Sequence, residues 1–179
     1  MAGGKGTRLH GLTAKTPKPM VRIGSKPLLE TIIEGFAEQG FSEFVLSVQY
    51  MADKIETYFG DGSHKGLKIS YIREAQPLGT AGSIKFIPVQ ESPFIVCNAD
   101  ILTDVDYQDL MRFHGVHGLN ATMCLALYQH QIPYGVVELD GGKIVAVQEK
   151  PVKNHYVNAG LYVLPGHAPS ILPNGPSDM

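Results

Sequence analysis

The sequence predicts an α/β fold, with a doubly wound, mostly parallel sheet and a β-rich C-terminal part. Helical and strand-like segments alternate as far as residue 117, and four strand-like runs follow from Ala121. Alternation of this kind is typical of a parallel sheet that helices cover on both faces. The chain has 179 residues, of which 44% are hydrophobic, so it can bury a substantial core within a single domain.

The alternating part contains seven expected elements. The first helix can begin at Pro27, because proline suits a first turn, and Gly40 can end it. Gly60 should stop the second helix, and Asp104 or Asp106 should lie near the N-cap of the last. In chain order, we expect helices over residues 27–39, 52–59, 80–86 and 106–117 and strands over residues 43–48, 67–73 and 94–97.

The C-terminal part is expected to be a set of strands. A tight turn is expected at Asp140-Gly141-Gly142, between two apolar runs. Neither an internal repeat nor a low-complexity linker interrupts the chain, and residues 173–179 have a loop-like composition. The expected strands cover residues 121–127, 135–139, 143–147 and 156–164.

A glycine-rich segment near the N-terminus carries the strongest functional signal. Gly3, Gly4 and Gly6 lie within four positions, so the backbone there can approach a ligand closely. Consecutive amides in such a loop can point at one anion. Arg8 and Lys18 add two cations, one a planar fork and the other a mobile point charge. This combination suits a triphosphate better than a lone carboxylate.

The run G-G-K-G-T-R-L, followed by Pro17-Lys18-Pro19, resembles the signature of the sugar-1-phosphate nucleotidylyltransferases, also called nucleotide-sugar pyrophosphorylases. The resemblance implies a Rossmann-like, glycosyltransferase-A-like fold. No Walker-A run exists in the chain. A dinucleotide fingerprint, and with it an NAD(P)-dependent oxidoreductase, is disfavoured because Leu9 stands where the third glycine belongs.

Asp100 is the candidate metal ligand. It follows the apolar run of residues 94–97, and in an open α/β sheet ligands bind beyond the carboxyl ends of the strands. Mg²⁺ prefers one or two carboxylates together with phosphate oxygens. The resemblance likewise gives this aspartate to the metal, so Mg²⁺ is the expected cofactor. The alternative is that Asp100 caps a loop by bonding local amides.

The resemblance assigns further residues to the nucleotide. Leu78-Gly79-Thr80-Ala81-Gly82 resembles the family's nucleobase-reading stretch, in which Gly79 lies closest to the base and Gly82 begins a helix beside it. Thr80 could instead simply cap that helix. The full expected set of nucleotide-binding residues is Ala2, Gly3, Gly4, Gly6, Thr7, Gly79 and Gly82.

Three later segments match the sugar-phosphate half of the family's site. Gly135 would let the sugar approach, Glu149 would accept hydrogen bonds from its hydroxyls, and Lys150 would neutralise its phosphate. Asn158 offers both a donor and an acceptor. Each could alone be an ordinary surface residue, but the order of the segments along the chain agrees with the family.

The resemblance implies that a sugar-1-phosphate attacks the α-phosphate of a nucleoside triphosphate and releases pyrophosphate, with Arg8, Lys18 and Asp100 as catalytic residues. It is greatest for the mannose- or amino-sugar-1-phosphate guanylyltransferase branch, which favours GTP. The family's second metal-binding aspartate is not found, and Asp178 lacks the expected context. A non-catalytic regulatory relative that binds nucleotide or sugar is therefore the alternative.

Composition restricts the partners and the location. The net charge of −2 favours no nucleic acid, and no apolar run has the length of a membrane span. Cys97 and Cys124 lie in strand-like runs, which indicates buried, reduced thiols and a cytoplasmic protein. A homo-oligomer is compatible with the family. Both ends suggest that the catalytic domain is incomplete, because family members carry an apolar strand before the glycine loop and continue beyond residue 179.

Overall fold

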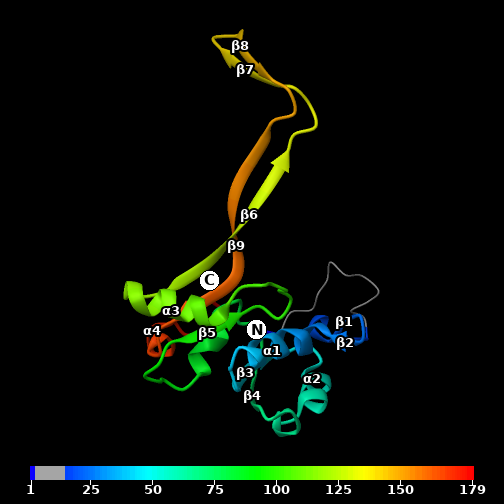
Figure 1. Cartoon of the computed structure of the whole chain (residues 1–179), viewed down its shortest axis with the longest axis vertical. Coiled ribbons are helices and arrows are strands. Elements are labelled where there is room, and N and C mark those ends of the chain that lie inside the picture. The colour runs from blue at the N-terminus through cyan, green and yellow to red at the C-terminus, as the bar shows by residue number, and fades with distance from the viewer. Residues whose placement is uncertain (3–14) are drawn as a thin grey trace. The chain divides into compact units, whose positions relative to one another are not determined.

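The computed structural model describes residues 1–2 and 15–179. They form two compact units, one of Met1–Thr122 with Gly160–Met179 and the other of Met123–Ala159. Figure 1 shows the elements of both units along the chain. None of the described helices has the length and apolar character that crossing a membrane requires.

The first unit begins with alternating strands and helices, as expected. Pro27, with a ψ of 146°, is the N-cap of the first helix rather than part of its first turn, and Gly40 follows the helix end with a φ of +89°. Strands β3 and β4 pair in parallel, from Glu43 opposite Lys68 to Val48 opposite Arg73. The elements are β1 (Arg22–Ile23), β2 (Lys26–Pro27), α1 (Leu28–Glu38), β3 (Glu43–Val48), α2 (Ala52–Phe59) and β4 (Lys68–Arg73).

Among the remaining elements of this unit, the short helix before β5 differs from the expected one in its bounds. A short helix was expected over residues 80–86; the helix is of the 3-10 type and covers Gly82–Phe86, so it begins at the glycine that the resemblance gives as its start. The Ala81 amide bonds the chain's C-terminal segment, and Pro88 limits the helix at its other end. The further elements are η1 (Lys18–Met20), η2 (Ser63–Lys65), η3 (Gly82–Phe86), β5 (Phe94–Cys97), α3 (Tyr107–His117) and α4 (Ala168–Ile171).

The second unit is built of antiparallel strands. Strands β7 and β8 pair up to Asp140 and Lys143, and both intervening glycines have positive φ, as a two-residue hairpin turn requires. Strand β9 pairs with β6, and its last residues, Leu161–Leu164, belong to the first unit, where they pair with β5. The strands are β6 (Thr122–Gln131), β7 (Val136–Asp140), β8 (Lys143–Gln148) and β9 (Val152–Leu164).

The α/β class is confirmed, and three further expectations are resolved. Asp106 is the N-cap of α3, where its carboxylate accepts a 2.8 Å hydrogen bond from the Asp109 amide. Strands β6 and β9 are longer than expected, because backbone pairing rather than burial supports their polar residues. Cys97 and Cys124, which were expected to be buried, are only half-buried.

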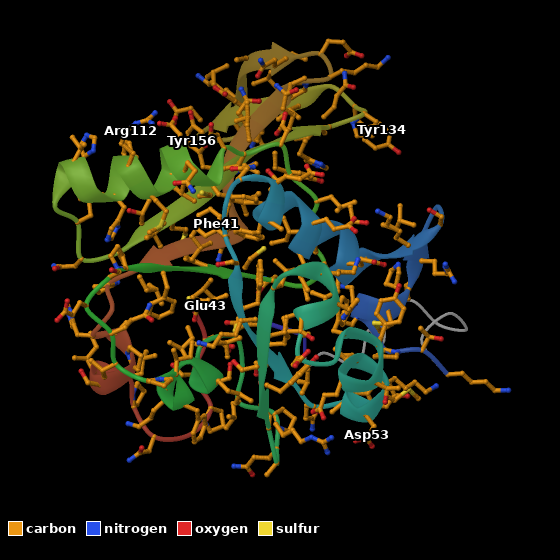
Figure 2. The ribbon with its side chains drawn as sticks, turned by 60° about the horizontal axis from the view of Figure 1, so that its bottom comes forward. Phe41, Glu43, Asp53, Arg112, Tyr134 and Tyr156 are labelled. Atoms are coloured by element: carbon orange, nitrogen blue, oxygen red, sulfur yellow. The ribbon has the colours of Figure 1, made fainter. Side chains whose placement is uncertain are left out.

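The main apolar core lies in the first unit. Figure 2 shows the side chains that the structure describes, including Asp53 of α2, which bonds Arg73 at the end of β4. Helices α1 and α2 bury one face of each against β3 and β4. The cluster consists of Ala2, Leu29, Ile33, Leu46, Val48, Ile55, Phe59, Ile69 and Ala99.

Met1 and Ala2 lie between β3 and β5, which do not bond each other. The Met1 amino group donates to the Cys97 carbonyl oxygen at 2.6 Å, and the Ala99 amide donates to the Met1 carbonyl oxygen at 3.0 Å. On the other side, the Ala2 amide donates to the Ser47 carbonyl oxygen at 2.8 Å. These bonds follow the pattern of parallel strands.

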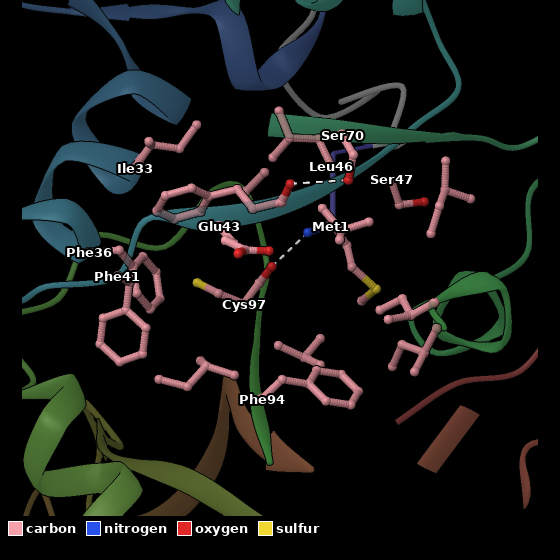
Figure 3. A pocket seen from close by; sticks show the side chains of 18 of the residues that line it. Met1, Ile33, Phe36, Phe41, Glu43, Leu46, Ser47, Ser70, Phe94 and Cys97 are labelled. Atoms are coloured by element: carbon pink, nitrogen blue, oxygen red, sulfur yellow. Dashed lines mark hydrogen bonds between the residues drawn. The ribbon is translucent and has the colours of Figure 1, made fainter. Parts of the chain in front are cut away.

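A largely apolar cavity of about 510 Å³ lies beside this junction, with walls from α1, β3, β5 and η3. Figure 3 shows Met1 at the cavity with its amino group bonded to Cys97. Burial lowers the pKa of that amino group, because a charge is costly among apolar walls. Lys18 and Asp100 are not among the described residues that line this cavity, so we do not assign it to the reaction.

A buried carboxylate links α1 to α2 and η2. Glu30 of α1 accepts a 2.7 Å hydrogen bond from the Tyr58 hydroxyl and forms an ion pair with Lys65. Burial alone would raise the pKa of Glu30, but the hydrogen bonds from Lys65 and Tyr58 outweigh it and lower the pKa. The charged form of Glu30 therefore stabilises the folded protein.

We expect Glu30→Gln to lower the free energy of unfolding by about 1–3 kcal/mol at pH 7. Because folding lowers the pKa of Glu30, its contribution is complete above the unfolded-state pKa and disappears as pH falls through the folded-state pKa. The difference between variant and wild type should therefore narrow below about pH 4. Denaturant unfolding of wild type and Glu30→Gln, from pH 7 to below about pH 4, measures this difference in free energy. The control is Glu38→Gln, at the exposed end of α1. A difference that stayed constant with pH would contradict the prediction.

Candidate active site

Two of the predicted catalytic side chains meet, although 82 positions separate them in the chain. Lys18 begins the short helix η1, and Asp100 follows the end of β5. The Lys18 ammonium forms an ion pair with one oxygen of the Asp100 carboxylate. Their side chains are 33% and 38% exposed, so a ligand can reach both. The structure thus places a cation and an anion together beyond a strand end.

The backbone places the predicted nucleotide-binding residue Ala2 next to this pair. The Met1–Ala2 junction is bonded to Ala99, the neighbour of Asp100, and to Ser47 at the end of β3. Ala2 therefore lies close to Asp100. The predicted residues Gly3, Gly4, Gly6, Thr7 and Arg8 lie outside the described residues, so their roles stay predictions.

The predicted nucleobase loop, Leu78–Gly82, contacts the chain's own C-terminal segment. A Cβ atom at Gly79 would lie 2.5 Å from the Ser177 carbonyl oxygen, and one at Gly82 would lie 2.8 Å from that of Gly175. Larger residues at positions 79 and 82 would therefore displace this segment. The close approach of the C-terminal segment therefore explains why both positions are glycine, independently of any contact with a nucleobase.

Two carboxylates that sequence reasoning did not select hold this loop. Glu74 accepts hydrogen bonds from the Leu78 amide, at 3.1 Å, and from the Ser47 hydroxyl. Asp178 accepts a 2.9 Å hydrogen bond from the Thr80 amide. Glu74 follows strand β4, and this position was the only signal that could have selected it. No local pattern marks Asp178.

The second unit brings together three of the predicted sugar-phosphate residues. Val136 of β7 pairs with Gln148 of β8, so Gly135 and Glu149 continue from paired positions. A Cβ atom at Gly135 would lie 3.1 Å from a Glu149 carboxylate oxygen. The Lys150 ammonium lies 3.9 Å from the other oxygen of Glu149, and both side chains are mostly exposed. Asn158 belongs to β9 of the same unit.

The donor set at Asp100 fits a magnesium ion that arrives with a nucleotide. One accessible carboxylate with phosphate oxygens is a set that Mg²⁺ accepts. Within residues 1–2 and 15–179, no group of three or more His, Cys, Asp or Glu side chains could enclose a metal by itself. Asp178 bonds Thr80, and so its nearest partner is a loop amide.

The nucleotidyl transferase family model matches residues 1–172. The chain belongs to the nucleotidyl transferase family. The predicted resemblance is thereby confirmed, and so is the Rossmann-like α/β fold.

Two curated relatives of this nucleotidyl transferase illustrate the sequence similarity. It is 34% identical over 181 residues to a mannose-1-phosphate guanyltransferase beta-B of Xenopus laevis, a match that covers 96% of the chain and 49% of the relative. It is 33% identical over 195 residues to a UTP–glucose-1-phosphate uridylyltransferase of Synechocystis, with 98% and 50% covered. The chain thus spans about half the length of the curated relatives it matches.

The fold resembles solved structures of HddC from Yersinia pseudotuberculosis. One has a TM-score of 0.75 and 29% identity, and the match covers 99% of this chain and 80% of that one. A second, of HddC complexed with GMP-PN, has a TM-score of 0.71. A glucose-1-phosphate thymidylyltransferase structure from Bacillus anthracis shares the fold at 21% identity, with a TM-score of 0.71.

Proposed function

We propose that this chain is part of a single catalytic domain that joins a nucleoside triphosphate to a sugar-1-phosphate and releases pyrophosphate. The observation that carries the proposal is the meeting of Lys18 and Asp100 beside Ala2, the residue before the glycine-rich segment. A cation and a metal-binding carboxylate at one place suit a reaction between phosphates. The named activities of the relatives belong to the same reaction class.

We propose GTP as the triphosphate and a mannose-like or amino sugar as the other substrate. Several relatives are named as mannose-1-phosphate guanylyltransferases, and one HddC structure contains GMP-PN. A relative of similar identity is named as a uridylyltransferase, so the base needs a direct test. We assign the reaction to the cytoplasm, which contains nucleoside triphosphates and keeps thiols such as those of Cys97 and Cys124 reduced.

In this reaction, an oxygen of the sugar phosphate attacks the α-phosphorus of the triphosphate. The bond from that phosphorus to the β-phosphate oxygen breaks, and pyrophosphate leaves with the electron pair. The attacking oxygen is already anionic, so the site needs alignment and charge neutralisation rather than a strong base. This requirement agrees with a site built from glycine, arginine, lysine and aspartate.

Each predicted residue has one task in this scheme. Lys18 would stabilise the negative charge that develops at the α-phosphate, and Arg8 would hold the leaving pyrophosphate. Asp100 would hold Mg²⁺, which supplies positive charge to the phosphate oxygens. Because Lys18 bonds Asp100 in this structure, the Lys18 side chain must turn from the carboxylate toward the phosphates when Mg²⁺ and the nucleoside triphosphate bind.

The sugar phosphate would be bound by the residues that meet in the second unit. Glu149 would accept hydrogen bonds from sugar hydroxyls, and Lys150 would pair with the phosphate. Gly135 would leave space for the sugar ring beside Glu149. Asn158 would donate to, or accept from, a hydroxyl.

The test is a panel of reactions with the full-length protein, Mg²⁺, four nucleoside triphosphates and several sugar-1-phosphates. We expect pyrophosphate release only when both substrates are present, and the highest rate with GTP. Turnover with a different base would correct the choice of nucleotide alone. Folded protein that binds nucleotide but turns over no pair would instead indicate a regulatory relative.

A further inference from the structure

The last residues of the chain pack along the loop that we assign to the nucleobase. The Ser177 amide donates to the Leu78 carbonyl oxygen at 2.8 Å, and the Ala81 amide donates to the Ser177 carbonyl oxygen at 2.8 Å. One residue of the C-terminal segment therefore bonds both ends of the loop. We call residues 175–179 the strap.

Asp178 bonds the middle of the loop. Its carboxylate accepts from the Thr80 amide at 2.9 Å and from the Thr80 hydroxyl at 3.2 Å. The Thr80 hydroxyl in turn accepts from the Met179 amide at 2.9 Å. Thr80 was a candidate cap for the helix that follows, but that helix has Ala81 as its N-cap, without a side-chain hydrogen bond. The strap therefore supplies acceptors for the Thr80 and Ala81 amides, which precede the helix.

Both glycines of the loop are suited to this contact. Gly79 has a φ of +76°, which L side chains rarely adopt, and any Cβ there would collide with Ser177 and Asp178. At Gly82 a Cβ would collide with Gly175 and with the side chain of Leu78. The close approach of the strap therefore depends on the same residues that the nucleobase assignment uses.

Contacts hold the chain both before the strap and at its end. Three residues before the strap, the Leu172 carbonyl oxygen accepts a 2.8 Å hydrogen bond from the Lys85 ammonium of η3. At its end, the Met179 side chain packs against the buried cluster that contains Ala81 and Ile84. The loop therefore cannot change its shape independently of the strap.

We propose that Asp178 is a positioning residue that sets the shape of the nucleobase loop and thereby the affinity for the nucleotide. The inference depends on the proposed function, because the loop's role in binding the base does. Asp178 need not touch the nucleotide: it fixes the Thr80 amide, and the strap fixes Leu78 and Ala81. Without the carboxylate, the loop has to be ordered when the nucleotide binds, and that cost weakens binding.

The test uses the full-length protein with Asp178→Ala, Asp178→Asn and, as a control, the exposed carboxylate variant Glu91→Ala. In the absence of nucleotide, we expect the Thr80 amide to exchange its hydrogen about tenfold faster in Asp178→Ala than in wild type. Asn keeps an acceptor oxygen of the same reach, so Asp178→Asn should largely restore the protection. Glu91→Ala should leave it unchanged.

The second readout is affinity. We expect the Kd for GTP, from titration of the protein alone, to rise about 3- to 10-fold in Asp178→Ala, with kcat within about twofold of wild type. Unchanged exchange at Thr80 would overturn the contact. Faster exchange with an unchanged Kd would overturn the positioning role, and a fall in kcat without a change in Kd would do the same.

These outcomes separate the inference from the proposed function. A protein that binds GTP but turns over no sugar phosphate refutes the reaction, while the changes in exchange and Kd still support the role of Asp178. A protein that turns over normally and keeps the same Kd in Asp178→Ala supports the reaction and refutes the inference. A protein that binds none of the triphosphates refutes both.

Discussion

Replacing Asp100 with Asn is expected to lower the turnover of the full-length protein by at least about 100-fold with little loss of stability. Asn keeps the shape of the side chain but lacks the charge that a hard cation requires. The ion pair with Lys18 is about one-third exposed, so its loss should cost no more than about 1 kcal/mol. Turnover against Mg²⁺ concentration and thermal unfolding measure the two effects.

Asp104→Asn is a suitable control, because Asp104 is an exposed aspartate of the same segment. It should leave both the Mg²⁺ requirement and the turnover near those of wild type. The opposite behaviour at position 100, with stability lost and Mg²⁺-dependent turnover intact, would make Asp100 a structural loop cap. The Lys18 contact would then be a surface ion pair without a catalytic role.

Local patterns predicted the elements of this fold well. The apolar stripe of α1, bounded by Pro27 and Gly40, gave bounds within about one residue, because caps and periodicity act over a single turn. The turn at Gly141 and Gly142 could be predicted for the same reason, since both φ values are positive. The start of the helix at residue 82 was less predictable, because the amides just before it bond residues almost one hundred positions away.

The residue types of the candidate site could be predicted from the sequence more readily than the contacts between these residues. Glycine, lysine and aspartate at strand ends indicated phosphate chemistry, and Lys18 and Asp100 do meet. Sequence spacing carries no information about a contact between residues 80 and 178, so the strap and its aspartate were not predicted. Glu74 was missed because a single carboxylate after a strand is common, and only its bonds to Leu78 and Ser47 distinguish it.

The Lys18–Asp100 pair also yields a prediction that separates catalysis from metal binding. Lys18→Met keeps the apolar stem of the side chain but removes the ammonium. We expect turnover to fall by about 100- to 1000-fold, because charge at the α-phosphate loses its stabilising partner. Meanwhile the Mg²⁺ concentration for half-maximal turnover should decrease, since Lys18 no longer competes with the ion for the Asp100 carboxylate.

The two variants should therefore move the Mg²⁺ requirement in opposite directions while both lower turnover. Lys15→Met, at an exposed lysine three positions upstream, is the control for a general loss of positive charge and should change neither quantity. Near-normal turnover in Lys18→Met would remove Lys18 from the mechanism. A higher Mg²⁺ requirement in that variant would show that Lys18 supports the metal site rather than competing with it. The scheme in which Lys18 leaves Asp100 to meet the phosphates would then be wrong, because it requires the two cations to exchange places at one carboxylate.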